Sequence, residues 1–327
     1  MNSFYLYTET AFHHQGDLEF LKKLILESKN AGSKGIKFQV LTNINDFVST
    51  YHKAYKDLSS YCFSLEEWDQ IFSYTASIGL DIIMMPLNIE ALVLLKNHAV
   101  KYIDIHSVSF NDTRLLNAVR ESNIDIILGV GGRTLDEIFI QKNNFGDKLK
   151  ILMVGFQSFP SKLEKIKLSK IEQLKCIFPE LEIGYADHSS FDDKFSVLSN
   201  DYARLLGATV FEKHISITEG EDRVDAASAV DPSKITNIID RLNFIEKFII
   251  DKEDSFVMEE EEITYRNRQL VCVAVEDLKS GEILNVDTVA LKMIHDPSDC
   301  FKIPRQIHGK VLKKNIKKDH PFTSNHF

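Results

Sequence analysis

The chain has 327 residues, 44% of them hydrophobic and 27% charged, which suits a globular protein with one large domain and a small one. Its formal net charge of -9 argues against a general nucleic-acid-binding surface, because phosphate contacts need clustered Lys and Arg. We expect no signal peptide, no membrane span and no disulfide or zinc framework from the four scattered cysteines, and therefore a reduced, cytoplasmic protein.

Short β-branched or aromatic runs alternate with longer stretches of helical period up to about residue 250. The predicted strands are residues 4–8, 35–40, 80–85, 102–106, 124–130, 150–154, 181–185 and 209–214. Helical stretches are predicted over 17–32, 65–79, 89–100, 113–123, 194–207 and 235–250. Eight strand-then-helix units of this length predict an α/β fold of the (β/α)8 TIM-barrel type.

An open, doubly wound sheet is the alternative arrangement of such units. That fold usually carries a GxGxxG motif after its first strand, and this sequence has none there. The sequence GVGGR at 129–133 follows the fifth predicted strand and lacks the pattern, so we interpret it as a tight turn. The barrel is therefore the preferred fold.

The sequence changes character after the barrel. Residues 251–268 are acidic and lack an apolar pattern, which indicates a solvated linker, with a docking motif as the alternative. Residues 269–327 alternate short β runs with a KSG turn, which predicts a small β-rich module with its own modest core. The expected organisation is a barrel domain over 1–250, a linker over 251–268 and a small domain over 269–327.

Chemically capable side chains gather where the predicted strands end, and in a barrel these positions face one shared mouth. They are Glu9, His13 and His14 after the first strand, Lys37 and Gln39 in the second, Ser107 after the fourth, Asp187 and His188 after the seventh, and Glu212 and His214 in or after the eighth. Lys37 and Gln39 are two residues apart, so both point to the same side of their strand.

Two of these residues, His188 and His214, lie 26 residues apart, which is one strand–helix repeat. Neighbouring strands are spaced by about 4.8 Å, so both rings should converge at the same height. Two imidazoles without a thiolate suit Mn²⁺, Zn²⁺ or Fe²⁺, whereas the alternative for each is a hydrogen-bonded structural histidine. A buried lysine such as Lys37 requires an anionic ligand or a paired carboxylate such as Glu9.

Five motifs, in one order along nearly the whole chain, resemble those of the sialic acid synthases, the family of N-acetylneuraminate and related nonulosonate synthases. ETAFHHQG (9–16) is similar to E-x-G-x-N-H-x-G, and AGSKGIKFQ (31–39) to A-G-A-d-x-x-K-x-Q. IGYADH (183–188) is one residue from I-G-Y-S-D-H, and VFEKHIS (210–216) is similar to I-E-K-H-F-T. The small module resembles the family's antifreeze-like (SAF) domain, with its K-x-G-E-x-L turn at 279–284.

The resemblance implies condensation of phosphoenolpyruvate with an N-acylated amino-sugar aldehyde, which releases phosphate and gives a nine-carbon 2-keto acid. It implies a divalent metal, with Mn²⁺ expected and Mg²⁺, Zn²⁺ or Co²⁺ as alternatives, and a homodimer in which each small domain caps the partner's barrel. The implied roles are metal binding by His188 and His214, phosphoenolpyruvate binding by Lys37 and Ser107, sugar contacts by Gln39 and Asp225, a further substrate contact by Gln157, and catalysis by Glu9 and Asp187.

Several positions depart from the family pattern. Met85 stands in place of a hydroxyl donor to phosphate, and Ser109 stands in place of an active-site carboxylate. Ala186 replaces a serine, and Gln157 stands where an asparagine is usual. Phosphate and sugar contacts are thus lost while the histidine pair remains.

In the small domain, Met293 stands where an arginine would reach the partner's sugar, with Lys292, Lys302 or Arg305 as substitutes. Three hypotheses follow from the departures as a whole. The leading one is a metal-dependent synthase of a sialic-acid-like sugar. The second is a related enzyme with another 2-oxo donor or acceptor, and the third is a catalytically silent subunit for binding or assembly.

Overall fold

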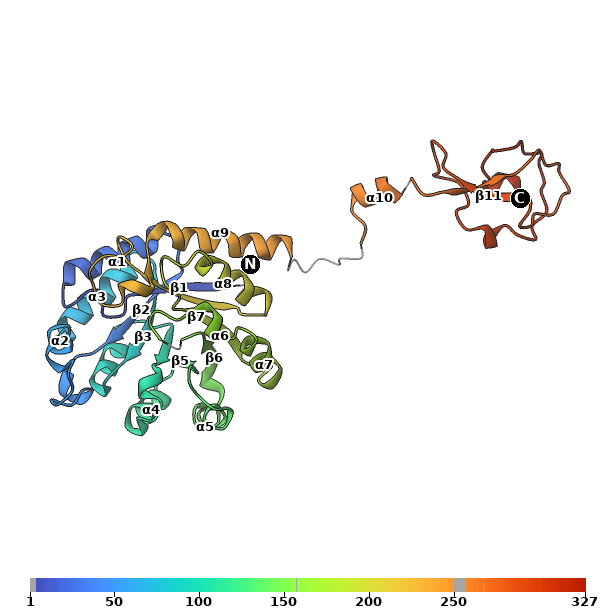
Figure 1. The fold of residues 1–327 in the computed structure, drawn as a ribbon. Coiled ribbons are helices and arrows are strands. Elements are labelled where there is room, and N and C mark those ends of the chain that lie inside the picture. Colours follow the sequence, from blue (N-terminus) through green and yellow to red (C-terminus); the bar gives the residue numbers. More distant parts are fainter. Residues whose placement is uncertain (1–3, 157, 250–256, 267) are drawn as a thin grey trace. The chain divides into compact units, whose positions relative to one another are not determined.

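A closed barrel of parallel strands forms the first part of the molecule (Figure 1). The computed structural model describes residues 4–156, 158–249, 257–266 and 268–327. The chain divides into two compact units, Met1–Asp251 and Lys252–Phe327. In the first unit each strand pairs with the next one along the chain, and the first also pairs with the eighth. The predicted TIM barrel is confirmed.

All eight predicted strands are present, each within two residues of its expected bounds. They are β1 (Tyr5–Glu9), β2 (Gly35–Val40), β3 (Asp81–Pro86), β4 (Tyr102–Ile105), β5 (Asp125–Gly129), β6 (Leu149–Val154), β7 (Glu182–Asp187) and β8 (Val210–Ile215). A two-residue strand, β9 (Ala229–Val230), pairs with the end of β8. The strands are rich in Ile, Val and Leu because both of their faces are covered, one by the helices and one by the barrel interior.

Helices cover the outside of the barrel. They are α1 (Leu18–Asn30), α2 (Tyr55–Ser60), α3 (Leu65–Ser77), α4 (Thr113–Glu121), α5 (Leu135–Phe145), α6 (Leu163–Ile166), α7 (Lys170–Ile177), α8 (Ser196–Leu205) and α9 (Pro232–Phe248). Polar caps begin several of them: Asp17 accepts a bond from the Phe20 N–H at α1, and Ser64 forms a capping box with Glu67 at α3. Among the described residues, no helix combines the length and hydropathy that a membrane span requires.

One predicted helix takes a different form. The stretch expected to be helical over 89–100 is a 3₁₀ helix, Ile89–Lys96. Asn88 occupies its N-cap position without making a capping bond. Its side-chain amide instead donates to Thr42 Oγ1 at 2.8 Å and to Asp46 Oδ2 at 3.2 Å, in the loop after β2. The residue that would begin an α-helix is therefore committed to a neighbouring loop.

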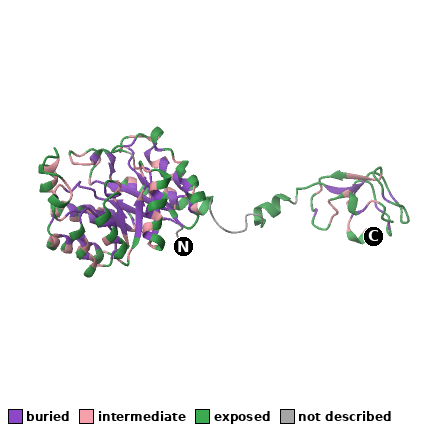
Figure 2. Cartoon of the chain, turned by 90° about the horizontal axis from the view of Figure 1, so that it is seen from below, coloured by how far each residue is buried: buried purple, intermediate pink, exposed green. Residues whose placement is uncertain are grey.

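Two layers of apolar side chains hold the barrel together. The larger layer lies between the strands and the helices and includes Leu21 of α1, Ile71 of α3 and Leu115 of α4. The smaller layer fills the barrel interior with Tyr7, Ile83, Ile127, Ile151, Met153, Ala186 and Val210. Figure 2 shows the buried strands at the centre and the exposed residues on the surrounding helices. The interior is a packed core, as in other barrels of this type, and leaves the strand ends for polar residues.

The GVGGR segment forms the predicted tight turn between β5 and α5. Gly132 has φ +70°, a conformation that favours glycine. A Cβ at Gly131 would lie 2.1 Å from the backbone oxygen of Phe156, which belongs to the loop after β6. The absence of a side chain at Gly131 therefore allows two loops of the barrel mouth to approach each other closely.

The second unit begins with a helix that lies inside the predicted linker. Residues 251–256 and 267 of that linker lie outside the described residues. The rest includes α10 (Glu260–Arg266), which has no buried residues, and the role of the segment as a linker stays a prediction. The first turn of α10 holds three glutamates and its last turn holds Arg266. This arrangement of charges interacts favourably with the helix dipole and stabilises the helix, although none of its residues is buried.

The remainder of the second unit is a small domain with its own core. Its strands β10 (Val271–Ala274) and β11 (Val289–Lys292) pair in antiparallel fashion. The core consists of Cys272, Ala274, Leu278, Leu284, Ile307, Leu312, Ile316 and Phe322. Gly281 has φ +96°, as the KSG turn requires. The antifreeze-like identity of this domain stays a prediction.

Candidate active site

A pocket of about 460 Å³ opens where the strands of the barrel end. Seven of the predicted site residues line it: Glu9, Lys37, Gln39, Ser107, His188, His214 and Asp225. They come from β1, β2 and β8 and from the segments after β4, β7 and β8, yet they converge because strand ends of a barrel share one mouth. A pocket of this volume suits a small organic substrate.

Lys37 lies at the centre of a buried ionic cluster. Its Nζ is 2.9 Å from Glu9 Oε2, 2.8 Å from Asp104 Oδ2 and 2.6 Å from Glu212 Oε2. The Tyr7 hydroxyl also donates to Glu212 Oε2, at 2.7 Å. Each of the four charged side chains is no more than 4% exposed. Three carboxylates therefore surround one ammonium, and the paired-carboxylate alternative considered for Lys37 describes what is present.

In this cluster, burial and the oppositely charged neighbours shift the pKa of each side chain in opposite directions. At Lys37, burial disfavours the ammonium, but the three carboxylates outweigh it and hold the pKa well above its usual value. Burial raises the pKa of Glu212 well above its usual range, and it raises the pKa of Asp104. Burial opposes ionisation of Glu9 as well, but Lys37 and His214 hold its pKa well below the usual range. Glu9 is therefore the carboxylate that stays ionised beside the histidines.

The two histidines converge as the repeat spacing predicts. The ring centroids of His188 and His214 are 4.6 Å apart. His214 Nε2 lies 3.2 Å from Glu9 Oε2, so the first and eighth strands meet at this point. The other oxygen of Glu9 accepts a bond from Gln39 Nε2 at 2.8 Å, which fixes the orientation of the carboxylate.

The donor set of this site fits a divalent cation. Glu9, His188, Glu212 and His214 each offer one ligand atom, and these atoms lie within 4.8 Å of one another. The His188 Nδ1 lies 3.2 Å from the Ala186 carbonyl, which can only accept, so the ring proton resides on Nδ1 and the Nε2 lone pair is available. Burial lowers the pKa of His188 well below its usual value, which keeps the ring neutral, as a metal ligand must be.

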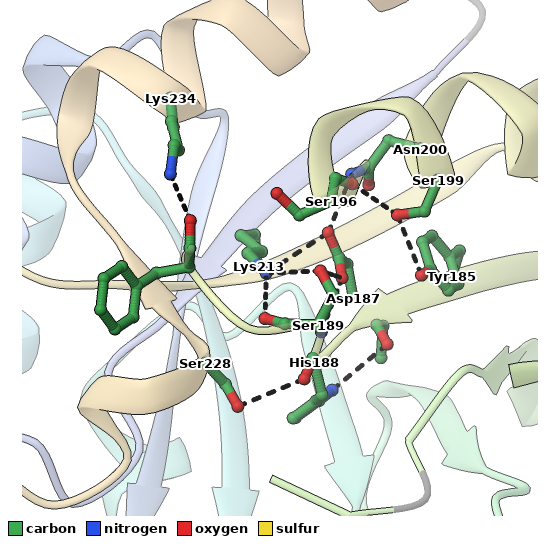
Figure 3. Close-up of polar contacts among 12 residues, drawn as sticks. Tyr185, Asp187, His188, Ser189, Ser196, Ser199, Asn200, Lys213, Ser228 and Lys234 are labelled. Atoms are coloured by element: carbon green, nitrogen blue, oxygen red, sulfur yellow. Dashed lines mark hydrogen bonds and ion pairs between the residues drawn. The ribbon is translucent and has the colours of Figure 1, made fainter. Parts of the chain in front are cut away.

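Asp187 lies on the opposite face of β7 from His188 (Figure 3). Its carboxylate accepts bonds from Ser189 N–H at 2.9 Å, Ser189 Oγ at 2.6 Å and Asn200 Nδ2 at 3.0 Å, and lies 3.3 Å from Lys213 Nζ. Successive residues of an extended chain point to opposite faces, so one of the pair must face away from the pocket. The described residues that line the pocket do not include Asp187. Its contacts hold the chain next to His188, and its catalytic role stays a prediction.

Ser107 and Asp225 line the pocket in the loops after β4 and β8. Asp225 adopts φ +65°, and burial raises its pKa. Ser107 begins a 3₁₀ turn, and its carbonyl oxygen accepts a bond from Arg133. Gln157 lies outside the described residues.

The positions at which the sequence departs from the family pattern lie partly in the pocket and partly elsewhere in the chain. Met85 and Ala186 line the pocket, so apolar atoms take the places of two hydroxyl groups. Ser109 is buried and is not among the described residues that line the pocket. Met293 belongs to the second unit and is 67% exposed.

Sequence reasoning missed three residues of the site. Asp104 binds Lys37, Tyr7 binds Glu212, and His106 lines the pocket. His106 Nδ1 accepts a bond from the Val108 N–H at 3.0 Å, and burial lowers the pKa of the ring to about 4, so it is neutral with its proton on Nε2. The signal was available, since Asp104 and His106 alternate with isoleucines in YIDIH and therefore share the inward face of β4.

Comparison with known proteins agrees with this arrangement. A model of the NeuB family matches residues 24–254. The protein MJ1065 of Methanocaldococcus jannaschii is 28% identical over 292 residues, which cover 88% of this chain and 84% of the relative. The N,N'-diacetyllegionaminic acid synthase of Campylobacter jejuni is 24% identical over 332 residues, which cover 95% of this chain and 96% of that enzyme.

The fold also matches a solved structure. A Chromobacterium violaceum protein assigned to spore coat polysaccharide biosynthesis superposes with a TM-score of 0.84 over 98% of both chains, at 22% identity. At that identity the likeness shows the fold alone. The family match is stronger, because it spans most of the barrel unit and more than half of the chain. The chain belongs to the NeuB family.

Proposed function

We propose that this chain condenses phosphoenolpyruvate with the aldehyde of an N-acylated amino sugar to give a sialic-acid-like nonulosonate. The observation that carries the proposal is the convergence of Glu9, Lys37, His188, Glu212 and His214 at one barrel mouth. Membership of the NeuB family supports it, as does similarity along most of the chain to an N,N'-diacetyllegionaminic acid synthase.

The reaction consumes one water. The new bond joins C3 of phosphoenolpyruvate to the aldehyde carbon, the aldehyde oxygen gains a proton, and C2 becomes a ketone as phosphate leaves. Phosphoenolpyruvate is a weak carbon nucleophile, so the aldehyde must be activated and held in line with it. A divalent metal, with Mn²⁺ expected, would be held by His188 and His214 beside Glu9 and would supply Lewis-acid polarisation of the aldehyde carbonyl.

Glu9 is the side chain best placed to move a proton or orient the attacking water. It lies in the pocket and stays ionised, because Lys37 and His214 hold its pKa well below the usual range against the effect of burial. Gln39 fixes one of its oxygens, so the other keeps a defined direction. We assign Gln39 and Asp225 to the acceptor sugar and Ser107 to the donor, since all three line the same pocket.

The surroundings of Lys37 favour a second candidate function, in which the donor carries no phosphate. Three acidic side chains, with Glu9 ionised, already bond this ammonium, and Lys37 is the only lysine or arginine among the described residues that line the pocket. Met85 and Ala186 add apolar surface where the family pattern has hydroxyl groups. An unphosphorylated 2-oxo acid such as pyruvate would place less negative charge next to this cluster.

The test is incubation of the intact chain with Mn²⁺, phosphoenolpyruvate and a panel of N-acyl hexosamines. We expect phosphate and a 2-keto acid in equal amounts, detected by colorimetry and mass spectrometry, and neither with His188→Ala. Calorimetric titration with phosphoenolpyruvate and with pyruvate separates the two candidates. Absence of a keto-acid product with either donor and every sugar would count against both.

We also infer that the chain acts as a homodimer in which the second unit caps the partner's barrel mouth. The inference follows the family resemblance of that unit, and Met293, Lys302 and Arg305 are the residues concerned. The exposed side chains of Met293 and Arg305 are free to meet such a partner. Light scattering of the intact chain tests the dimer, and a monomer at all concentrations would exclude it.

A further inference from the structure

The pocket combines polar residues with apolar surfaces, and one of these apolar surfaces is built from a single packed cluster. We call this surface the apolar wall; it consists of Phe12, Phe47, Leu58, Met85, Leu87 and Val224, which all line the pocket. The six side chains belong to a single packed cluster. They come from the loops after β1, β2 and β8, from α2 and from the end of β3, so several separate segments converge to build one surface.

Part of this surface faces the pocket and is not covered by the protein. Phe12, Met85 and Leu87 are at most 8% exposed and form the back of the wall. Phe47, Leu58 and Val224 are only partly buried, so their remaining surface is available to a ligand. Apolar surface that a ligand can remove from water contributes favourable binding free energy.

The wall lies next to the residues assigned to the acceptor sugar. Gln39 of β2 is the register partner of Met85 in β3, and Asp225 directly follows Val224. A sugar held by Gln39 and Asp225 would therefore lie beside the wall. The substituents of an amino sugar that can cover such a surface are its acyl chains.

We infer that the apolar wall binds an N-acyl chain longer than acetyl on the acceptor sugar, an inference that rests on the proposed function for the identity of the acceptor. Each added methylene buried against the wall should tighten binding about fourfold, the equivalent of about 0.8 kcal/mol. A hydroxyl at the same place should lose this gain, because none of the six side chains offers a hydrogen-bond partner.

The experiment compares acceptors that differ only in the acyl group: N-acetyl, N-propanoyl, N-butanoyl and N-glycolyl mannosamine. N-glycolyl has nearly the size of N-propanoyl and replaces its methyl group by a hydroxyl. KM is measured with the intact chain, Mn²⁺ and phosphoenolpyruvate. Affinity is measured separately by calorimetry with the corresponding sugar alcohols, which lack the aldehyde and do not react. The expected order of tightness is butanoyl, propanoyl, then acetyl and glycolyl.

Amino-acid substitutions test whether the apolar wall causes the preference for longer acyl chains. Val224→Thr keeps the side-chain volume and adds a hydroxyl, and Leu58→Asn makes a partly exposed position polar; both should reduce the butanoyl-to-acetyl preference at least fourfold. Leu205→Asn is the matched control, since Leu205 lies on α8 outside the pocket lining and is 48% exposed. The control should keep the preference of the native chain.

The outcomes separate this inference from the proposed function. Product formation with equal or tighter binding of the acetyl and glycolyl compounds would overturn the inference and leave the function intact. A chain-length preference among the sugar alcohols without any product would support the wall and refute the condensation. A preference that survives in both wall variants would also overturn the inference, because another surface would then be responsible.

Discussion

Asp187 and Lys213 lie directly opposite each other on the neighbouring strands β7 and β8, with Oδ2 and Nζ 3.3 Å apart. Each comes one residue before a pocket histidine, His188 and His214 respectively. Both side chains are at most 1% exposed, and Lys213 also donates to the Ser189 carbonyl at 3.1 Å. This ion pair on the outer face therefore fixes the relative position of the two strands that carry the histidines on the inner face.

Replacement of Lys213 by methionine should be strongly destabilising, because it leaves the buried Asp187 carboxylate without its cation. We expect the free energy of unfolding to fall by about 3–5 kcal/mol. The matched control is Lys142→Met, which breaks the surface pair with Glu180 and should cost less than about 1 kcal/mol. Urea denaturation followed by circular dichroism measures both, and a similar loss in the two variants would contradict a special role for the pair.

The purified chain should contain about one divalent ion bound by the histidine pair. His188→Ala removes one of the two imidazoles and should release the ion, whereas His98→Ala should retain it, because His98 bonds Asp69 outside the pocket. Elemental analysis after dialysis measures the metal content independently of activity. A metal-free native chain that also fails to bind added Mn²⁺ would favour the silent, assembly-type subunit.

Asp104→Asn should strengthen the binding of phosphoenolpyruvate about tenfold, since it replaces one of the three acidic side chains around Lys37 by a neutral amide. The amide keeps the shape of the carboxylate, so the barrel should remain folded. Asp81→Asn is the control, because Asp81 bonds Tyr5 and Lys101 at the start of β3, away from the pocket. Calorimetric titration gives both affinities, and an unchanged or weaker affinity in Asp104→Asn would show that Lys37 does not face the donor.

The stability of the barrel should decrease below neutral pH because of His14. The ring is buried against Phe63, with centroids 4.8 Å apart, and burial lowers its pKa from 6.5 to about 3. Between these values the unfolded chain binds a proton that the folded chain does not, so stability is complete above the unfolded pKa and is lost as the pH falls. At pH 5 this loss is about 2 kcal/mol relative to pH 8.

Urea denaturation of His14→Gln at both pH values isolates this contribution. The variant lacks the titrating ring, so its stability should change less between pH 8 and pH 5 than that of the native chain. The other titrating groups are common to both proteins and cancel in the comparison. Equal pH dependence in the two proteins would show that His14 is not the group responsible.

The sequence predicted the strands and the converging side chains better than it predicted their partners. Strand positions follow from local apolar runs, and the common mouth follows from the closed barrel. The same alternation that placed Lys37 and Gln39 together also separates Asp187 from His188. It turns Asp104 of β4 toward the barrel interior, where it bonds Lys37 of β2. Which carboxylates meet Lys37 depends on barrel closure and side-chain reach, which no single motif contains.

The local sequence pattern also failed to predict the type of helix where a capping residue forms tertiary hydrogen bonds instead of a capping bond. Asn88 would begin a helix at 89, but its bonds to Thr42 and Asp46 commit it to another loop. The helix α10 in the acidic segment is the opposite case, because no tertiary contact is needed to explain it. It has no buried residues, and the charges in its end turns suit the helix dipole. The first case depends on one capping residue, whereas α10 depends on charged residues in both of its end turns.

Removal of residues 252–327 should leave the barrel folded and weaken binding of the acceptor sugar. The two units have separate cores, so the urea midpoint of the barrel should change little. If the second unit caps a partner's mouth, the truncated chain should bind N-acyl sugar alcohols at least tenfold more weakly, the loss expected for one charge-assisted contact. Calorimetry and light scattering on both chains test this, and a truncated chain with native sugar affinity would show that the barrel alone forms the complete site.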